Sequence, residues 1–377
     1  MSWHGIRTVA TLELRQRVRT SKWPIVLAVW VGLIGLVAFL SYWATNDEQL
    51  RSGEAMYDIV IFFVLGLAML IVPSLTATSV NGDREHGVLA TLQTTLLTHW
   101  DIVLGKLAAA WAISLAFLVS AMPFMAWAWF EGGVSGGRIV LSLLVLVLVL
   151  AVVCTLGLMF STLTARPIAS AVLTYLTMGA LVFGTLIGFG LSAFLVTQTD
   201  QQQVFGIPDN WYDTHQPPAI DPADPTLTQE QIDQLNKSGQ PTRADCTTFT
   251  RKTEVAHTER IWWMLPLNPF VVVADAAPSE PRKSNQAFAS GFTPMRWISG
   301  GARMARNGPD LVVDECAMQT SMDGTGYVDP AEAALRSGPV WPYGLAFLLV
   351  LGAGAAVVAG RRLQTPIRRL PNGTRIA

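Results

Sequence analysis

The stretch NGDREHGVLATLQTTLLTHWDIVLGK, residues 81–106, lies between two long apolar runs of the sequence. It begins with three charged residues at 83–85, continues with mixed apolar and polar residues, and leads directly into the second run. About 20 mostly apolar residues suffice for a helix to cross a bilayer, and both neighbouring runs are that long. The stretch is therefore expected to be a short connection between two membrane-spanning helices.

The composition places the whole chain among membrane proteins. Of its 377 residues, 51% are hydrophobic and 14% are charged, whereas a soluble domain has about 25% charged residues. Acidic residues are concentrated in one polar segment, 198–340, and basic residues border the apolar runs. The first apolar run is long enough to span and lacks a small-residue cleavage pattern, so it is interpreted as an uncleaved helix.

Apolar runs predict six membrane-spanning helices, at 24–44, 58–80, 102–130, 139–163, 167–196 and 341–359. Lysine and arginine residues cluster before the first run and after the last one, which places both termini in the cytoplasm beneath the plasma membrane. Six crossings satisfy this orientation and leave the 81–101 connection in the cytoplasm. The Arg- and Trp-rich composition indicates a bacterial source.

The predicted fold class is an all-α polytopic membrane protein with six transmembrane helices and a large extracytoplasmic insert between helices 5 and 6. The chain divides into an N-terminal interfacial helix, five transmembrane helices, the insert, the sixth helix and a basic cytoplasmic tail. These parts cover residues 1–22, 23–197, 198–340, 341–360 and 361–377.

The N-terminal segment has the pattern of an amphipathic helix. Its apolar residues recur at spacings of three and four and form one stripe, made of Trp3, Ile6, Ala10 and Leu14. Glu13 and Arg17 flank the stripe as an i,i+4 pair. Together with the basic residues nearby, the stripe predicts a helix on the cytoplasmic leaflet, and a frayed tail that only sets the orientation is the alternative.

Two features distinguish the insert 198–340. Residues 261–276, IWWMLPLNPFVVVADA, are apolar but too short to cross and broken by prolines, so they predict a re-entrant or interfacial segment. A core element of the outer domain is the alternative. Cys246 and Cys316 both lie in the insert, where an extracytoplasmic compartment would permit a disulfide, although they could equally be two free thiols.

Motifs for catalysis and for cofactor or metal binding are missing from the sequence. It contains neither a GxxxxGK[ST] phosphate loop, nor HExxH, nor a CxxC pair, nor a G-x-S-x-G elbow. The 5 histidines are scattered. We therefore expect no enzyme activity, no catalytic residue, no bound cofactor or metal, and no nucleic-acid partner.

The apolar runs themselves carry almost no ionisable residues. Asp58, Arg138 and Arg166 stand only at the ends of runs. Charge within a membrane usually marks ion or proton pathways, so its scarcity argues against a proton-coupled carrier, a pump or a channel. Any cargo is expected to be hydrophobic or amphipathic and to be moved with energy from another protein.

The opening stretch has the pattern of a short helix followed by a second helix start. Val88, Leu89, Leu92 and Leu96 fall on one face of a helix over 83–97, and Asp83 and Glu85 are expected in its first turn. Thr98 and Asp101 form a capping-box pattern that begins the next spanning helix. On these residues alone, a connector packed on the membrane surface and a docking surface remain open.

The same stretch resembles the loop between the second and third helices of ABC-2 type transporter permeases. That family has a segment of the form E-R-E-x-G-T-L-E-x-L-L-x-T-P-x-x-x-x-x-I-x-x-G-K. The matching positions here are Arg84, Glu85, Gly87, Leu89, Leu92, Gly105 and Lys106, whereas Leu97 and Thr98 stand where the family has proline.

The resemblance implies that residues 83–97 are a coupling helix that docks on a separate ATP-binding cassette subunit, which would bind ATP and magnesium. The implied docking residues are Asp83, Arg84, Glu85, Gly87, Val88, Leu89, Leu92 and Leu96. The chain would then be the permease subunit of an exporter, paired with a second copy or a sister permease, and moving a lipid, drug, antibiotic or envelope component. A non-transporting membrane anchor whose insert binds an envelope partner is the alternative.

Overall fold

The computed structural model describes residues 2–19, 22–44, 52–85, 97–214, 241–278, 292–316 and 333–364. Within these ranges, six helical stretches are long and apolar enough to cross a membrane. They are Trp23–Ala44, Gly53–Glu85, His99–Phe130, Gly136–Leu163, Pro167–Leu195 and Trp341–Arg362. The predicted polytopic fold with six spanning helices is therefore confirmed.

Three long helices form the centre of the bundle: α3 (Ser52–Thr76), α6 (His99–Phe130) and α7 (Gly136–Leu163). Their buried side chains form most of the main hydrophobic core. The helix α2 (Lys22–Ala44) packs on α3 and α6, and α17 (Trp341–Arg362) packs along α7. Gly352 of α17 allows this close approach, because a Cβ there would lie 3.1 Å from a methyl group of Val152.

The fifth spanning stretch has few buried residues and contains a wide turn. It consists of α8 (Pro167–Gly179), a π-helical turn η1 (Ala180–Gly184) and α9 (Thr185–Leu195). The Asn268 side chain donates to the Val182 carbonyl over 2.8 Å. A buried amide therefore binds a backbone carbonyl in the π turn. In membrane helices, neighbouring groups commonly satisfy the backbone groups that such irregular turns leave without an intrahelical partner.

The third spanning helix begins where the capping-box pattern predicts. The Thr98 hydroxyl accepts the Asp101 backbone N–H over 3.2 Å, and the Asp101 carboxylate accepts the Thr98 N–H over 3.0 Å. Both bonds satisfy N–H groups that a helix start leaves without intrahelical partners. The capping box is confirmed, and it moves the start of the helix from the predicted 102 to His99.

The second spanning helix starts earlier than predicted, at Ser52 instead of 58. The extra turn contains Glu54, and a buried carboxylate is costly without a partner. The structure supplies the partners: Arg138 lies 3.4 Å from Glu54 and 3.0 Å from Asp58, and Arg296 lies 3.5 Å from Glu54. We call these four residues the distal cluster, since they lie at the end of the bundle away from the N-terminus.

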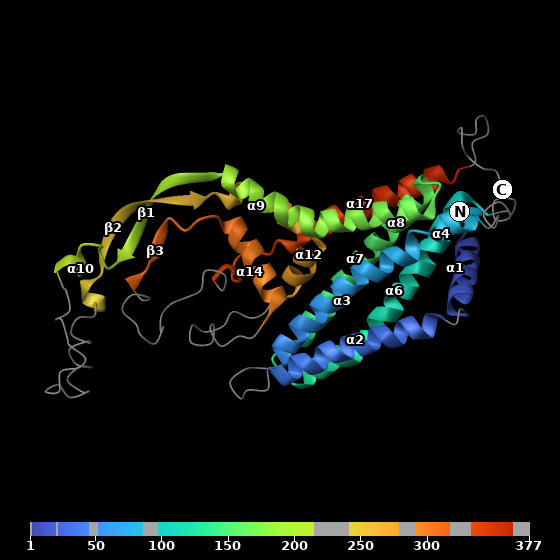
Figure 1. Cartoon of the computed structure of the whole chain (residues 1–377), viewed down its shortest axis with the longest axis horizontal. Coiled ribbons are helices and arrows are strands. Elements are labelled where there is room, and N and C mark those ends of the chain that lie inside the picture. The colour runs from blue at the N-terminus through green and yellow to red at the C-terminus, as the bar shows by residue number, and fades with distance from the viewer. Residues whose placement is uncertain are drawn as a thin grey trace.

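A small three-stranded sheet, which the sequence reasoning did not predict, extends beyond the distal end of the bundle (Figure 1). Its strands are β1 (Thr197–Gly206), β2 (Thr247–Ala256) and β3 (Val312–Asp314), in the order β2-β1-β3. β1 pairs antiparallel with β2 and parallel with β3. A disulfide joins Cys246, before β2, to Cys316, after β3, and so links the two outer strands.

The apolar segment 261–276 lies against the bundle. It forms a 3-10 helix, η4 (Trp262–Leu267), and a short helix, α12 (Pro269–Ala276). α12 is buried between α7, α17 and α14 (Pro294–Asn307), whereas Trp263 is 57% exposed. The re-entrant or interfacial assignment remains a prediction, and the packing against two spanning helices is compatible with it. Three shorter helical elements also lie in the described part: α10 (Trp211–Thr214), η2 (Arg243–Asp245) and η3 (Thr258–Arg260).

Candidate functional site

The structure describes the two ends of the segment expected to dock an ATPase. Asp83, Arg84 and Glu85 end the described part of α4 (Ser79–Glu85), and Leu97 precedes α6. The remaining candidate residues lie outside the described residues: Gly87, Val88, Leu89, Leu92 and Leu96. Of the described candidates, Glu85 is exposed and Arg84 is half-buried, with its guanidinium 3.5 Å from the Thr164 carbonyl.

The first turn of the charged helix is not where the sequence placed it. α4 begins at Ser79, so Asp83 and Glu85 lie beyond its first turn, and that prediction is wrong. The N–H groups of Val80 and Asn81 instead donate to the Ser161 hydroxyl of α7, over 2.9 and 3.2 Å. A hydroxyl from a neighbouring helix therefore satisfies N–H groups near the start of α4.

Lys106 is the central residue of this region. It is 3% exposed, and its ammonium binds the carboxylates of Glu13 and Asp83 and donates to the Ser79 carbonyl over 3.2 Å. Glu13 comes from α1 (Trp3–Val18) and Asp83 from α4, so the ammonium joins three helices. We call Lys106, Glu13 and Asp83 the Lys106 cluster. Because a buried ammonium needs charged partners, the cluster fixes the start of the docking segment to α1.

Two glycines allow α1 to approach α6. A Cβ on Gly105 would lie 2.6 Å from the Val9 Cβ, and a Cβ on Gly5 would lie 2.9 Å from Leu97 Cδ2. The Ser2 N–H donates to the Asp101 carboxylate over 2.8 Å and fastens the start of α1 as well. The adjacent glycine and lysine of the G-K motif therefore act together, since Gly105 admits α1 and Lys106 binds it.

α1 presents three different faces. Gly5, Val9 and Glu13 are buried against the α6 region, a face that the sequence reasoning did not identify. The predicted apolar stripe lies beside it, with Trp3 80% exposed. Glu13 and Arg17 form the predicted i,i+4 pair, 3.6 Å apart. The sequence signal for this buried face is the combination of Gly5 with Glu13 two turns later. A search for apolar periodicity does not detect it, because glycine and glutamate do not count as apolar residues.

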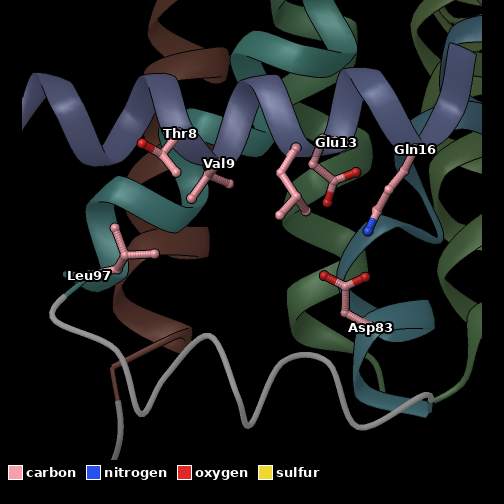
Figure 2. Close-up of a pocket in the computed structure, with 7 residues that line it drawn as sticks. Thr8, Val9, Glu13, Gln16, Asp83 and Leu97 are labelled. Atoms are coloured by element: carbon pink, nitrogen blue, oxygen red, sulfur yellow. The ribbon is translucent and has the colours of Figure 1, made fainter.

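A pocket opens between α1 and the two described ends of the docking segment (Figure 2). Side chains from one face of α1 point toward Asp83 on α4 and Leu97 before α6 (Figure 2). The lining residues are Thr8, Val9, Leu12, Glu13, Gln16, Asp83 and Leu97. α1 therefore stands directly beside the segment that the resemblance assigns to ATPase docking.

The last spanning helix ends in the same region. A Cβ on Gly360 of α17 would lie 2.7 Å from the Trp100 ring, and the Gln364 side chain lies 3.2 Å from His99 Nε2. Figure 1 shows this end of α17 and the helix α1 at one end of the bundle. The first and last described segments thus meet at the same end, as an even number of crossings requires.

Metal coordination is not indicated by the described residues. Among them, no group of three or more His, Cys, Asp or Glu residues could hold a metal ion. The Lys106 cluster is saturated by its own ion pairs and backbone bond, so its arrangement is that of a structural joint.

Comparison with known proteins assigns the family. No curated protein matches the chain. A family model described as ABC-2 family transporter protein matches residues 7–295, which is more than half of the chain and includes most of α1, the Lys106 cluster and the first five spanning helices. The chain therefore belongs to the ABC-2 transporter family and is a transmembrane subunit of an ABC transporter.

Proposed function

We propose that this subunit is the permease of an ATP-driven exporter and that residues 83–97 dock on a separate ATPase. The ATPase would carry ATP and magnesium, and the permease would work with a second copy or a sister permease. Both termini would be cytoplasmic in the plasma membrane of a bacterium. The observation that carries the proposal is the position of Asp83, which begins the docking segment and binds Lys106 of α6 and, through it, Glu13 of α1.

This linkage supports a mechanical role for the docking segment. α4 follows α3 after a two-residue turn, and Lys106 lies two turns into α6. A force applied to the docking segment would therefore reach α1 and α6 together, because the Lys106 cluster connects both of them to α4. Coupled movement of packed helices as rigid bodies is a common way to transmit such a change.

The distribution of charge supports a hydrophobic or amphipathic cargo. In the described spanning helices, acidic and basic side chains lie near the two ends, and the ion pairs among them belong to the Lys106 cluster and the distal cluster. The middle turns of α3, α6 and α7 are packed with apolar side chains. A lipid, drug, antibiotic or envelope component suits such a route better than a small ion.

The test uses the purified full chain with the ATPase encoded beside its gene. One variant combines Arg84→Glu, Glu85→Arg and Leu92→Asp. We expect it to lose co-purification with the ATPase and transport-coupled ATP hydrolysis, because it reverses the charged end and places a carboxylate on the apolar face of the docking segment.

A matched control makes the same chemical changes at the distal sheet, as Arg243→Glu, Glu254→Arg and Leu311→Asp. All three side chains are exposed. We expect the control to keep the complex and its activity. Intact complex formation and intact coupled hydrolysis in the docking variant would refute the assignment. Full biological function without any ATPase would instead favour the anchor hypothesis.

A further inference from the structure

One face of α1 carries an exposed row of cationic side chains. Arg7, Arg15 and Arg19 are exposed, and together with Thr11 they line a shallow groove along the helix. His4 lies on the same face. By their helical spacing, Arg7 and Arg15 are turned away from the buried Val9, whereas Arg19 follows the last helical residue of α1. The groove borders the pocket beside the docking segment, with which it shares Thr8, Leu12 and Gln16.

The charge of this face is uncompensated among the residues that the structure describes. The acidic residue of α1, Glu13, is buried on the other side, where it binds Lys106 and Arg17. In the described part of the chain, no carboxylate lies within ion-pair distance of Arg7, Arg15 or Arg19. Three guanidinium groups thus point away from the protein, and guanidinium groups suit bidentate binding of phosphate.

Exposed apolar side chains border the same row. Trp3 is 80% exposed and Val18 is 55% exposed, both on the flank of α1 next to Arg7. A basic row beside exposed apolar residues is typical of helices that lie in the membrane interface with their cations at the headgroups. An acidic protein surface would match the arginines but would leave Trp3 and Val18 without an apolar partner.

α1 is also held in a fixed orientation. The Lys106 cluster, the Ser2–Asp101 bond and the close contact of Gly105 with Val9 attach it to α6 along much of its length. Figure 1 shows α1 lying across the end of the bundle, where α17 also ends. Its basic face therefore lies at the end of the bundle where α6 begins and α17 ends.

We propose that Arg7, Arg15 and Arg19 form a binding surface for the phosphate headgroups of anionic phospholipids in the cytoplasmic leaflet. The leaflet rests on the orientation proposed above, whereas the binding itself does not depend on an ATPase. An arginine near an anionic membrane surface contributes about fivefold in affinity, so three of them give a preference of about a hundredfold at low ionic strength.

The test measures lipid preference in the full chain. Protein in mixed micelles with equal phosphatidylglycerol and phosphatidylcholine is analysed by native mass spectrometry, and the retained lipids are counted. The variant Arg7→Gln, Arg15→Gln, Arg19→Gln is compared with Arg243→Gln, Lys252→Gln, Arg260→Gln, which removes the same charge from exposed positions distant from α1. We expect the first variant to lose at least tenfold in preference for phosphatidylglycerol and the second to keep it.

Two further measurements decide between explanations. The preference of the parent protein should fall when the salt concentration rises from 50 to 500 mM, since screening weakens exposed charges. Hydrogen exchange of α1 should be the same in both variants, which excludes unfolding of the helix. An unchanged preference in the α1 variant overturns the proposal. Loss of ATPase binding in nanodiscs of phosphatidylcholine alone, with an unchanged lipid preference, would assign the face to the ATPase instead.

Discussion

Replacing Lys106 with methionine tests the joint between α1, α4 and α6. Methionine keeps a similar length but removes the ammonium that binds Glu13 and Asp83. The two carboxylates would be left buried or half-buried without their partner, and the loss of one member of a buried ion pair costs about 3–5 kcal/mol. We expect this cost to appear as local opening of α1, because α1 has its main contacts with α6.

Hydrogen exchange of the α1 amides measures that opening directly. A cost of this size raises the open population by about two to four orders of magnitude, so the α1 amides should exchange faster by a similar factor. Lys252→Met, at an exposed position on β2, serves as the control and should leave α1 unchanged.

A second variant separates charge from shape. Lys106→Met combined with Glu13→Gln and Asp83→Asn removes all three charges, and neutral groups of similar size are tolerated where an unpaired charge is not. We therefore expect this combination to restore slow exchange in α1. If it exchanges as fast as Lys106→Met alone, or if Lys106→Met exchanges like the parent, the ion pairs do not hold α1 in place.

Two predictions concern the distal end. Asp58→Ala should lower the free energy of opening of α14 by about 3 kcal/mol, because it removes a partner of Arg138 and the acceptor of the Arg296 N–H. The loss is measured as faster hydrogen exchange in α14, and Asp310→Ala serves as the exposed control. Cys246→Ser should destabilise the sheet by about 4 kcal/mol, because the bond to Cys316 closes a long loop. Urea unfolding of the sheet, monitored by hydrogen exchange, measures this loss of stability. A reductant should lower the unfolding midpoint of the parent protein and leave that of the variant unchanged.

The parts of the fold that depend on local sequence were predictable. Six apolar runs gave six spanning helices, because a backbone in lipid must satisfy its own hydrogen bonds and a helix does so. Thr98 and Asp101 gave the start of α6, since both partners of a capping box lie within one turn. Errors of a few residues occurred at helix ends, as in the turn of α3 that contains Glu54.

The contacts that position the candidate site could not be predicted in the same way. Lys106 and Glu13 are far apart in the sequence, and so are Asp58 and Arg296. Periodicity reports which face of a helix is apolar, and it cannot report that a carboxylate on that helix will meet an ammonium on another. The sheet was missed for a related reason. β1 is rich in threonine and glutamine, and the residues that alternate into its buried face are Gln202, Val204 and Gly206, so the strand shows no alternation of apolar and polar residues.

The two clusters stand at opposite ends of one continuous spanning stretch, Gly53–Glu85. Asp58, near its first turn, binds Arg138 of α7 and the start of α14, whereas Asp83, near its end, binds Lys106. Between them lie Pro73, which removes one backbone hydrogen bond from α3, and the two-residue turn that separates α3 from α4. Ends that are fixed by buried charges and a middle that is weakened by proline make a helix that bends between its attachments.

That arrangement has a consequence for coupling. If docking of an ATPase displaces α4, the Lys106 cluster moves α1 and α6 with it, while the distal cluster keeps the first turns of α3 attached to α7 and α14. The relative movement is then concentrated between 73 and 78, where Thr76 contacts Gly157 of α7 closely. We therefore expect changes in hydrogen exchange on ATPase binding to be largest around this turn and small at either cluster, and a uniform change along the whole stretch would argue that α3 and α4 move as a single rigid helix.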